Sequence, residues 1–117
     1  MSEQHDLFMP RALQVATENE AKFPDDFLEW LPENMHVFEA FSLEATKVKA
    51  RGFTHYSAYT IVEFLRHHSA VRETKGEWKI NNNHRPYLAR LFDLVYPDRA
   101  GLFEYRITKK VHTELAA

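Results

Sequence analysis

The sequence predicts an α+β fold that is mostly helical, with four to five helices and a small two-stranded antiparallel sheet. Apolar residues recur at helical spacing over most of the 117 residues. Two short segments toward the C-terminus instead alternate apolar residues with charged ones, as half-buried strands do. The three glycines all fall between these periodic segments, where glycine is typical of turns.

Helical periodicity defines the main elements. We expect helices over residues 11–22, 33–51, 58–72 and 84–96, and a Pro-bounded turn of helix within 23–34. The pattern is clearest in the last helix, where apolar residues have the spacing i, i+3, i+4 and i+7. That stripe consists of Leu88, Leu91, Phe92 and Val95.

Residues that favour helix ends mark the boundaries. Gly52 follows the helix over 33–51, where a left-handed C-terminal cap is expected. Ser57 is a natural N-cap for the helix over 58–72, because its hydroxyl can accept a hydrogen bond from a free backbone amide. Within the asparagine triplet 81–83, we expect Asn83 to cap the helix over 84–96.

The two alternating segments are residues 77–81 (EWKIN) and 102–107 (LFEYRI). In the second segment, Phe103, Tyr105 and Ile107 share one face of the expected strand. Helices followed by strand, helix and strand are similar to a winged helix, in which a hairpin supports a recognition helix. A winged helix normally places two helices between such strands, whereas this order has one.

We expect a single domain over residues 1–117. Its parts are an acidic helical part over 1–52, a basic helix-strand-helix-strand part over 53–110, and a frayed tail over 111–117. No internal repeat, low-complexity tract or Gly/Ser linker divides the chain.

The composition excludes several classes of site. The chain has no Cys, which excludes disulfides, thiolate metal sites and a Cys nucleophile, and suits a reducing cytosol. It has no secretory apolar region and no run of about 18 apolar residues, so neither a signal peptide nor a membrane span is expected. We therefore expect a cytoplasmic protein.

The charges are segregated along the chain, although the net charge is only −2. Residues 1–45 contain ten Asp or Glu and two Lys or Arg, whereas residues 46–117 contain thirteen Lys or Arg and seven Asp or Glu. Two explanations are open. Either the basic part binds an anionic partner, or the two parts attract each other within one fold.

The segment Lys79–Arg90 (KINNNHRPYLAR) carries residue types that suit nucleic-acid recognition. A helix start presents free backbone amides to phosphate, Asn can contact adenine edges, and Arg can contact guanine or phosphate. The competing explanation is structural, because Asn is a routine cap and exposed helix faces often carry Arg. The candidate nucleic-acid-binding residues are Lys79, Asn82, Asn83, Arg85, Tyr87, Arg90, Arg99, Arg106, Lys109 and Lys110.

No pattern indicates catalysis or a bound cofactor. His67 and His68 are adjacent, so on a helix they point about 100° apart and do not easily face one metal ion. The chain has no Gly-rich phosphate loop and no Ser nucleophile motif. We expect no catalytic residues, no metal ligands and no cofactor, and therefore a protein that is not an enzyme.

The run GEWKINNNHRPYLARLFDLVYPDRAGLFEYR resembles small proteins encoded by bacteriophages and prophages. Those proteins carry a similar Lys-Ile-Asn-Asn-Asn, an aromatic-Ala-Arg helix, a Tyr-Pro turn and Gly-Phe-Phe-Glu. The resemblance covers Ser57–Arg106, a little under half of the chain, and not residues 1–56. It implies a product of a phage or mobile element in a bacterial cytoplasm, with two kinds of function. One is DNA binding for replication, recombination or transcriptional control, and the other is binding a host protein, including one of a defence system.

The leading hypothesis is a non-enzymatic DNA-binding protein, regulatory roles included, in which the helix over 84–96 approaches the duplex. The alternative is an inhibitor or adaptor that binds a host protein through the acidic, aromatic-rich residues 1–45. A continuous basic face centred on Arg85 and Arg90 would favour DNA. Basic residues neutralised by the N-terminal acids, with an acidic or apolar patch left exposed, would favour a protein partner. Small DNA-binding proteins are often homodimers, but no heptad marks a dimer helix here.

Overall fold

A computed structural model describes residues 9–72 and 80–103, with the backbone alone at 69–72. The described residues are mostly helical, as expected. In chain order the elements, with η for a 3-10 helix, are α2 (Arg11–Glu18), η1 (Glu20–Lys22), α3 (Asp25–Trp30), η2 (Leu31–Asn34), α4 (Met35–Ala50), α5 (Ala58–Arg72), η3 (Asn82–His84), α6 (Arg85–Val95) and η4 (Pro97–Arg99). No helix in this part of the chain is long and apolar enough to cross a membrane.

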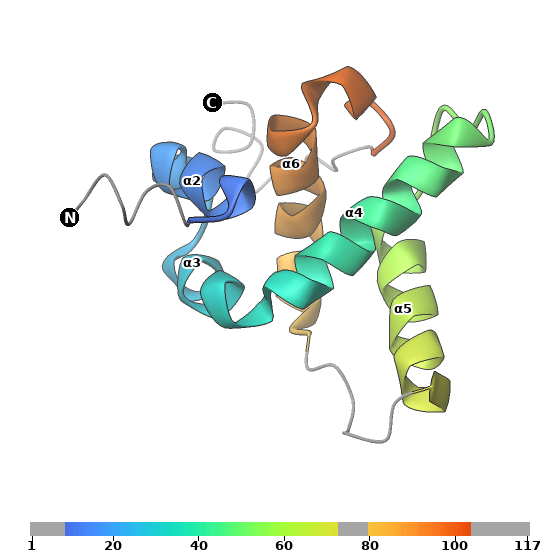
Figure 1. The fold of residues 1–117 in the computed structure, drawn as a ribbon, viewed down its shortest axis with the longest axis horizontal. Coiled ribbons are helices and arrows are strands. Elements are labelled where there is room, and N and C mark those ends of the chain that lie inside the picture. Colours follow the sequence, from blue (N-terminus) through green and yellow to red (C-terminus); the bar gives the residue numbers. More distant parts are fainter. Residues whose placement is uncertain (1–8, 73–79, 104–117) are drawn as a thin grey trace, which may run out of the picture.

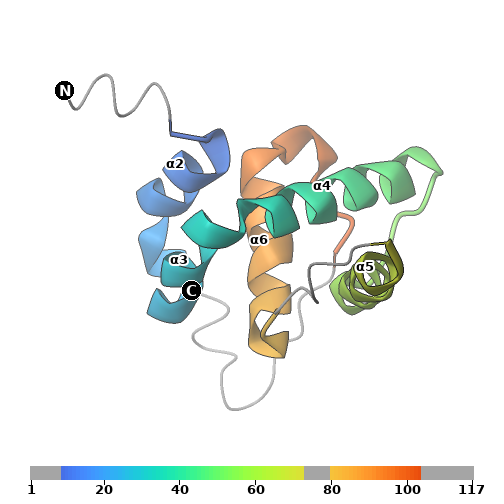
Figure 2. The same cartoon turned by 60° about the horizontal axis from the view of Figure 1, so that its bottom comes forward.

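Helix α6 lies at the centre of the fold. It packs against α2, α4 and α5, and in both views it lies between α2 and α3 on one side and α5 on the other (Figures 1 and 2). The predicted apolar stripe is the buried face of this helix. Of its eleven residues, Pro86 alone is exposed.

Three phenylalanine rings join α6 to α4 and to the segment after η4. The Phe41 ring stacks on that of Phe103 at 5.4 Å between centroids, and the Phe92 ring meets the other two edge-on at 6.4 and 5.9 Å. All three side chains are buried. Aromatic pairs at these distances contribute about 0.5–1.5 kcal/mol beyond the burial of their area.

The predicted two-stranded sheet is wrong, and with it the winged helix. The described residues contain no β-strand and a single isolated parallel bridge, between Tyr56 and Phe103. Leu102 and Phe103 are both buried, whereas adjacent residues of a two-faced strand point to opposite sides. The apolar pattern there reflects packing onto Phe41 and Phe92.

The other predicted strand, over 77–81, ends in a helical turn instead. Asn81 accepts a hydrogen bond from the backbone amide of Asn83 through its side chain and so begins η3. Residues 77–79, 104–107 and the predicted tail over 111–117 lie outside the described residues.

Two of the three predicted helix ends are confirmed. Gly52 has φ +97° and its amide donates to the Lys49 carbonyl at 3.0 Å, and the Ser57 hydroxyl accepts from the Thr60 amide at 3.4 Å. The prediction that Asn83 caps the last helix is wrong, since Asn81 is the capping residue. The capping residue comes earlier in the sequence than predicted because the 3-10 helix η3 precedes α6.

We expect Phe92→Ala to lower the free energy of unfolding by about 3–5 kcal/mol, because the ring is fully buried and its removal leaves a cavity. Urea denaturation followed by circular dichroism measures this loss. Leu43→Ala on α4 is the control, since Leu43 is 59% exposed and its truncation should change stability by less than about 0.5 kcal/mol. Equal losses of unfolding free energy in the two variants would contradict a core that is built around α6.

Candidate nucleic-acid interface

The structure describes six of the ten predicted nucleic-acid-binding residues. They are Asn82, Asn83, Arg85, Tyr87, Arg90 and Arg99. The other four lie outside the described residues, namely Lys79, Arg106, Lys109 and Lys110.

The described arginines do not form one continuous face. The Arg85 guanidinium lies over the Tyr59 ring of α5, 4.3 Å from its centroid, whereas that of Arg90 lies 5.7 Å from the centroid of Tyr87. Tyr87 in turn packs against Phe23 and Phe27, on the α3 side of the molecule. Residues five apart on a helix point about 140° apart, which separates Arg85 from Arg90.

Arg99 joins η4 to α4. Its Nη1 donates to the Thr46 hydroxyl at 3.2 Å, its Nε lies 3.7 Å from the Asp98 carboxylate, and its guanidinium lies 4.6 Å from the centre of the Tyr96 ring. Nearby, the Lys49 ammonium donates to the Ala100 carbonyl at 3.3 Å. These contacts indicate a structural role for Arg99, because they hold η4, which follows α6, against α4.

The start of α6 offers fewer free amides than the sequence predicts. The Asn83 amide donates to the Asn81 side chain at 2.9 Å, and the His84 amide donates to the Asn81 carbonyl at 2.8 Å. Pro86 has no backbone N–H at all. An anion at this helix start would therefore depend on side chains more than on the backbone.

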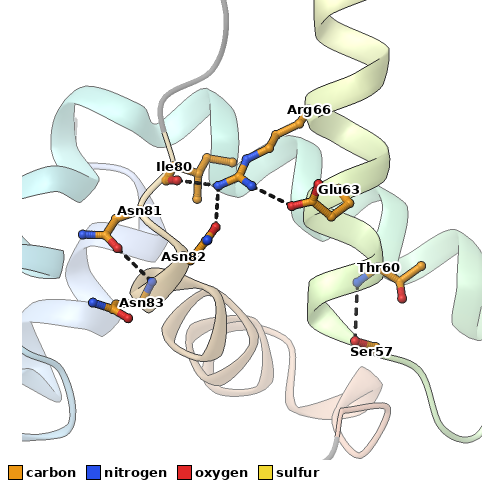
Figure 3. A network of polar contacts seen from close by, with 8 residues as sticks. All are labelled: Ser57, Thr60, Glu63, Arg66, Ile80, Asn81, Asn82 and Asn83. Atoms are coloured by element: carbon orange, nitrogen blue, oxygen red, sulfur yellow. Dashed lines mark hydrogen bonds and ion pairs between the residues drawn. The ribbon is translucent and has the colours of Figure 1, made fainter.

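Arg66 on α5 holds the segment that leads into α6 (Figure 3). Its guanidinium donates to the Glu63 carboxylate at 2.6 Å, to the Ile80 carbonyl, and to the Asn82 side-chain oxygen at 2.8 Å. Glu63 compensates the charge of Arg66. Sequence reasoning missed this residue, because its partners lie 14 and 16 positions away and leave no local signal.

Arg85 differs from the other arginines. Within the described part of the chain its guanidinium has no hydrogen bond and no ion pair, and its Nη1 is buried without an acceptor. The side chain is half-buried, and the Tyr59 side chain beneath it is 54% exposed. We use the term α5–α6 junction for this site, which consists of Tyr59, Asn82 and Arg85. The predicted residue Asn83 is not part of it, because its side chain points away from α5 (Figure 3).

The junction combines three kinds of contact that nucleic acids accept. Arg85 supplies an uncompensated guanidinium, Tyr59 an exposed aromatic ring, and the exposed Asn82 an amide group. Tyr59 was not predicted. The signal that indicates it is its spacing from Glu63 and Arg66, at i, i+4 and i+7, which places the three residues on one face of α5. Tyr59 on this face contacts Arg85 of α6, and Arg66 bonds to Ile80 in the segment before α6.

A single described ion pair links the acidic and basic parts. His84 is buried beside the rings of Phe27 and Trp30, and its Nε2 lies 3.3 Å from a carboxylate oxygen of Asp26. Six other acidic residues of the N-terminal half are exposed and have no ion pair. These are Glu18, Glu20, Asp25, Glu29, Glu33 and Glu39. Among the described residues, ion pairing between the two parts is therefore confined to this one contact.

No group of three His, Asp or Glu side chains in the described ranges is placed to hold a metal ion. A scan against models of protein families, a search of curated proteins and a search of solved structures found no match to this chain. The functional argument therefore depends on the geometry of the α5–α6 junction.

The bond between Arg66 and Asn82 can be measured with a double-mutant cycle. We expect Arg66→Ala and Asn82→Ala to show a coupling energy of about 0.5–1.5 kcal/mol in urea denaturation, the usual contribution of one hydrogen bond. The same cycle between Arg66→Ala and Asn83→Ala should give a coupling near zero, because those side chains share no hydrogen bond. Zero coupling in both cycles would show that Arg66 does not hold Asn82.

Proposed function

We propose that this chain is a DNA-binding protein without catalytic activity, and that it contacts DNA at the α5–α6 junction. The proposal includes an origin in a phage or mobile element and a place of action in the bacterial cytoplasm, as the resemblance implies. The observation that carries it is the Arg85 guanidinium, which lies on Tyr59 and has no acceptor within the described chain.

An unpaired guanidinium in a half-buried position is unusual. Arg is always charged and carries five N–H donors, and leaving a buried donor unsatisfied costs about 1–3 kcal/mol, with more for a charged group. The Tyr59 ring holds the Arg85 guanidinium flat, so little side-chain freedom is lost when an anion binds. A phosphate oxygen is a suitable acceptor, because Arg can contact phosphate through two parallel hydrogen bonds.

The alternative function, binding a host protein, rests on a separate observation. The six exposed and unpaired acidic residues of the N-terminal half could steer association with a basic protein surface. Phe23, Phe27, Phe38 and Phe41 of this half are buried in the core, so its carboxylates would make the contact. Exposed carboxylates are fully hydrated and need no partner, which is why we rank this function second.

Arg85→Gln should weaken binding to DNA roughly tenfold, because it removes a charge-assisted hydrogen bond to phosphate. It should also reduce the magnitude of the slope of log K against the logarithm of the salt concentration by about one. Fluorescence anisotropy of labelled oligonucleotides, at two salt concentrations, measures both effects.

Lys47→Gln is the matched control, because it removes one positive charge from an exposed position on α4. The control should keep the affinity of the parent within about twofold. If Arg85→Gln binds DNA as tightly as Lys47→Gln does, the α5–α6 junction is not the site. If the parent protein binds no DNA at low salt, the acidic surface becomes the leading candidate.

A further inference from the structure

We infer that the DNA bound at the α5–α6 junction is single-stranded. This inference rests on the proposed function and adds the class of substrate to it. Two observations support it: α6 cannot present a face to the major groove, and the exposed groups of the junction suit unpaired bases.

The first observation is the burial of α6. A recognition helix lies in a groove about 12 Å wide with several side chains exposed to base edges. Here α6 is packed among α2, α4 and α5, and Pro86 is its single exposed residue. The other residues of α6 are buried or partly buried, so the helix offers little exposed surface for contacts with base edges in a duplex groove.

The second observation is the exposed ring of Tyr59. Arg85 covers one face of the ring, yet more than half of the side chain remains exposed. In a duplex the bases are stacked on each other and are not available to such a ring. In a single strand each base has a free face, and stacking on an aromatic side chain accepts any base.

The polar groups around Tyr59 fit the same substrate. Asn82 is exposed, and its side-chain amide can reach the base edges that a single strand leaves unpaired. Arg66 keeps Asn82 in place, and Glu63 compensates the charge of Arg66. Arg85 is thus left as the uncompensated cation of the described junction, suited to the phosphate next to a stacked base.

The test uses the full chain and two fluorescent probes of equal length, a 20-nucleotide oligothymidylate and a duplex of mixed sequence. We expect anisotropy at low salt to show at least tenfold tighter binding of the single strand. Equal or tighter binding of the duplex would overturn the single-strand inference and leave the proposed function standing. Binding of neither probe would overturn the proposed function itself.

Variants on α5 test the stacking contact. Tyr59→Ala should weaken binding of the single strand by about five- to one hundred-fold, and Tyr59→Phe should retain most of the affinity. Phe64→Ala is the matched control, because Phe64 lies on the same helix, is 47% exposed, and points about 140° away from Tyr59. Circular dichroism confirms that each variant is folded. Similar losses for Tyr59→Ala and Phe64→Ala would overturn the assignment of Tyr59.

Discussion

The packing of α6 among α2, α4 and α5 is the constraint on which the rest of the structure depends. The apolar stripe of this helix is buried against its neighbours. This packing fixes the directions in which the side chains at the start of α6 point. Consecutive helical residues point about 100° apart. His84 therefore turns inward beside α3, and Arg85 turns toward Tyr59 on α5. The same burial that stabilises the core thus places the one unpaired guanidinium of the junction.

The contacts of Arg66 connect this core to the candidate site. They join Ile80 and Asn82, which lead into α6, to α5. Arg66 donates hydrogen bonds to the Ile80 carbonyl and to the Asn82 side-chain oxygen, and the Glu63 carboxylate compensates its charge. Five of the six exposed and unpaired acidic residues lie on α2, η1, α3 and η2, on the far side of α6 from α5, and the sixth, Glu39, lies on α4 (Figures 1 and 2). A phosphate at Arg85 would therefore approach from the side away from most of these carboxylates.

Local patterns in the sequence predict much of the fold. The helices over 33–51, 58–72 and 84–96 were predictable because helical periodicity and end signals such as Gly52 are local features. The sheet was not, because the apolar residues Leu102 and Phe103 fit a pleated strand as well as a segment packed onto Phe41 and Phe92. Those partners lie far away in sequence.

The candidate site was predictable in part. Asn82 and Arg85 were recognised from their residue types and lie at the α5–α6 junction, whereas Asn83 was recognised in the same way and points away from α5. Arg90 was grouped with Arg85 although helical geometry alone separates them by about 140°. Tyr59 contacts Arg85 of α6, and Arg66 contacts Asn82 before α6, in both cases across a long stretch of sequence. Composition and spacing within one segment do not reveal such contacts.

The central claim is that the surface around Tyr59 and Arg85 receives a single strand of DNA. Its most direct test is a titration of the isotopically labelled protein with oligothymidylate, followed by amide chemical shifts in NMR spectra. The account predicts that the largest shifts occur at Tyr59, Asn82 and Arg85, while the amides of α2 and α3 stay unchanged. Shifts concentrated on α2 and α3, or no shifts at saturating oligonucleotide, would contradict it.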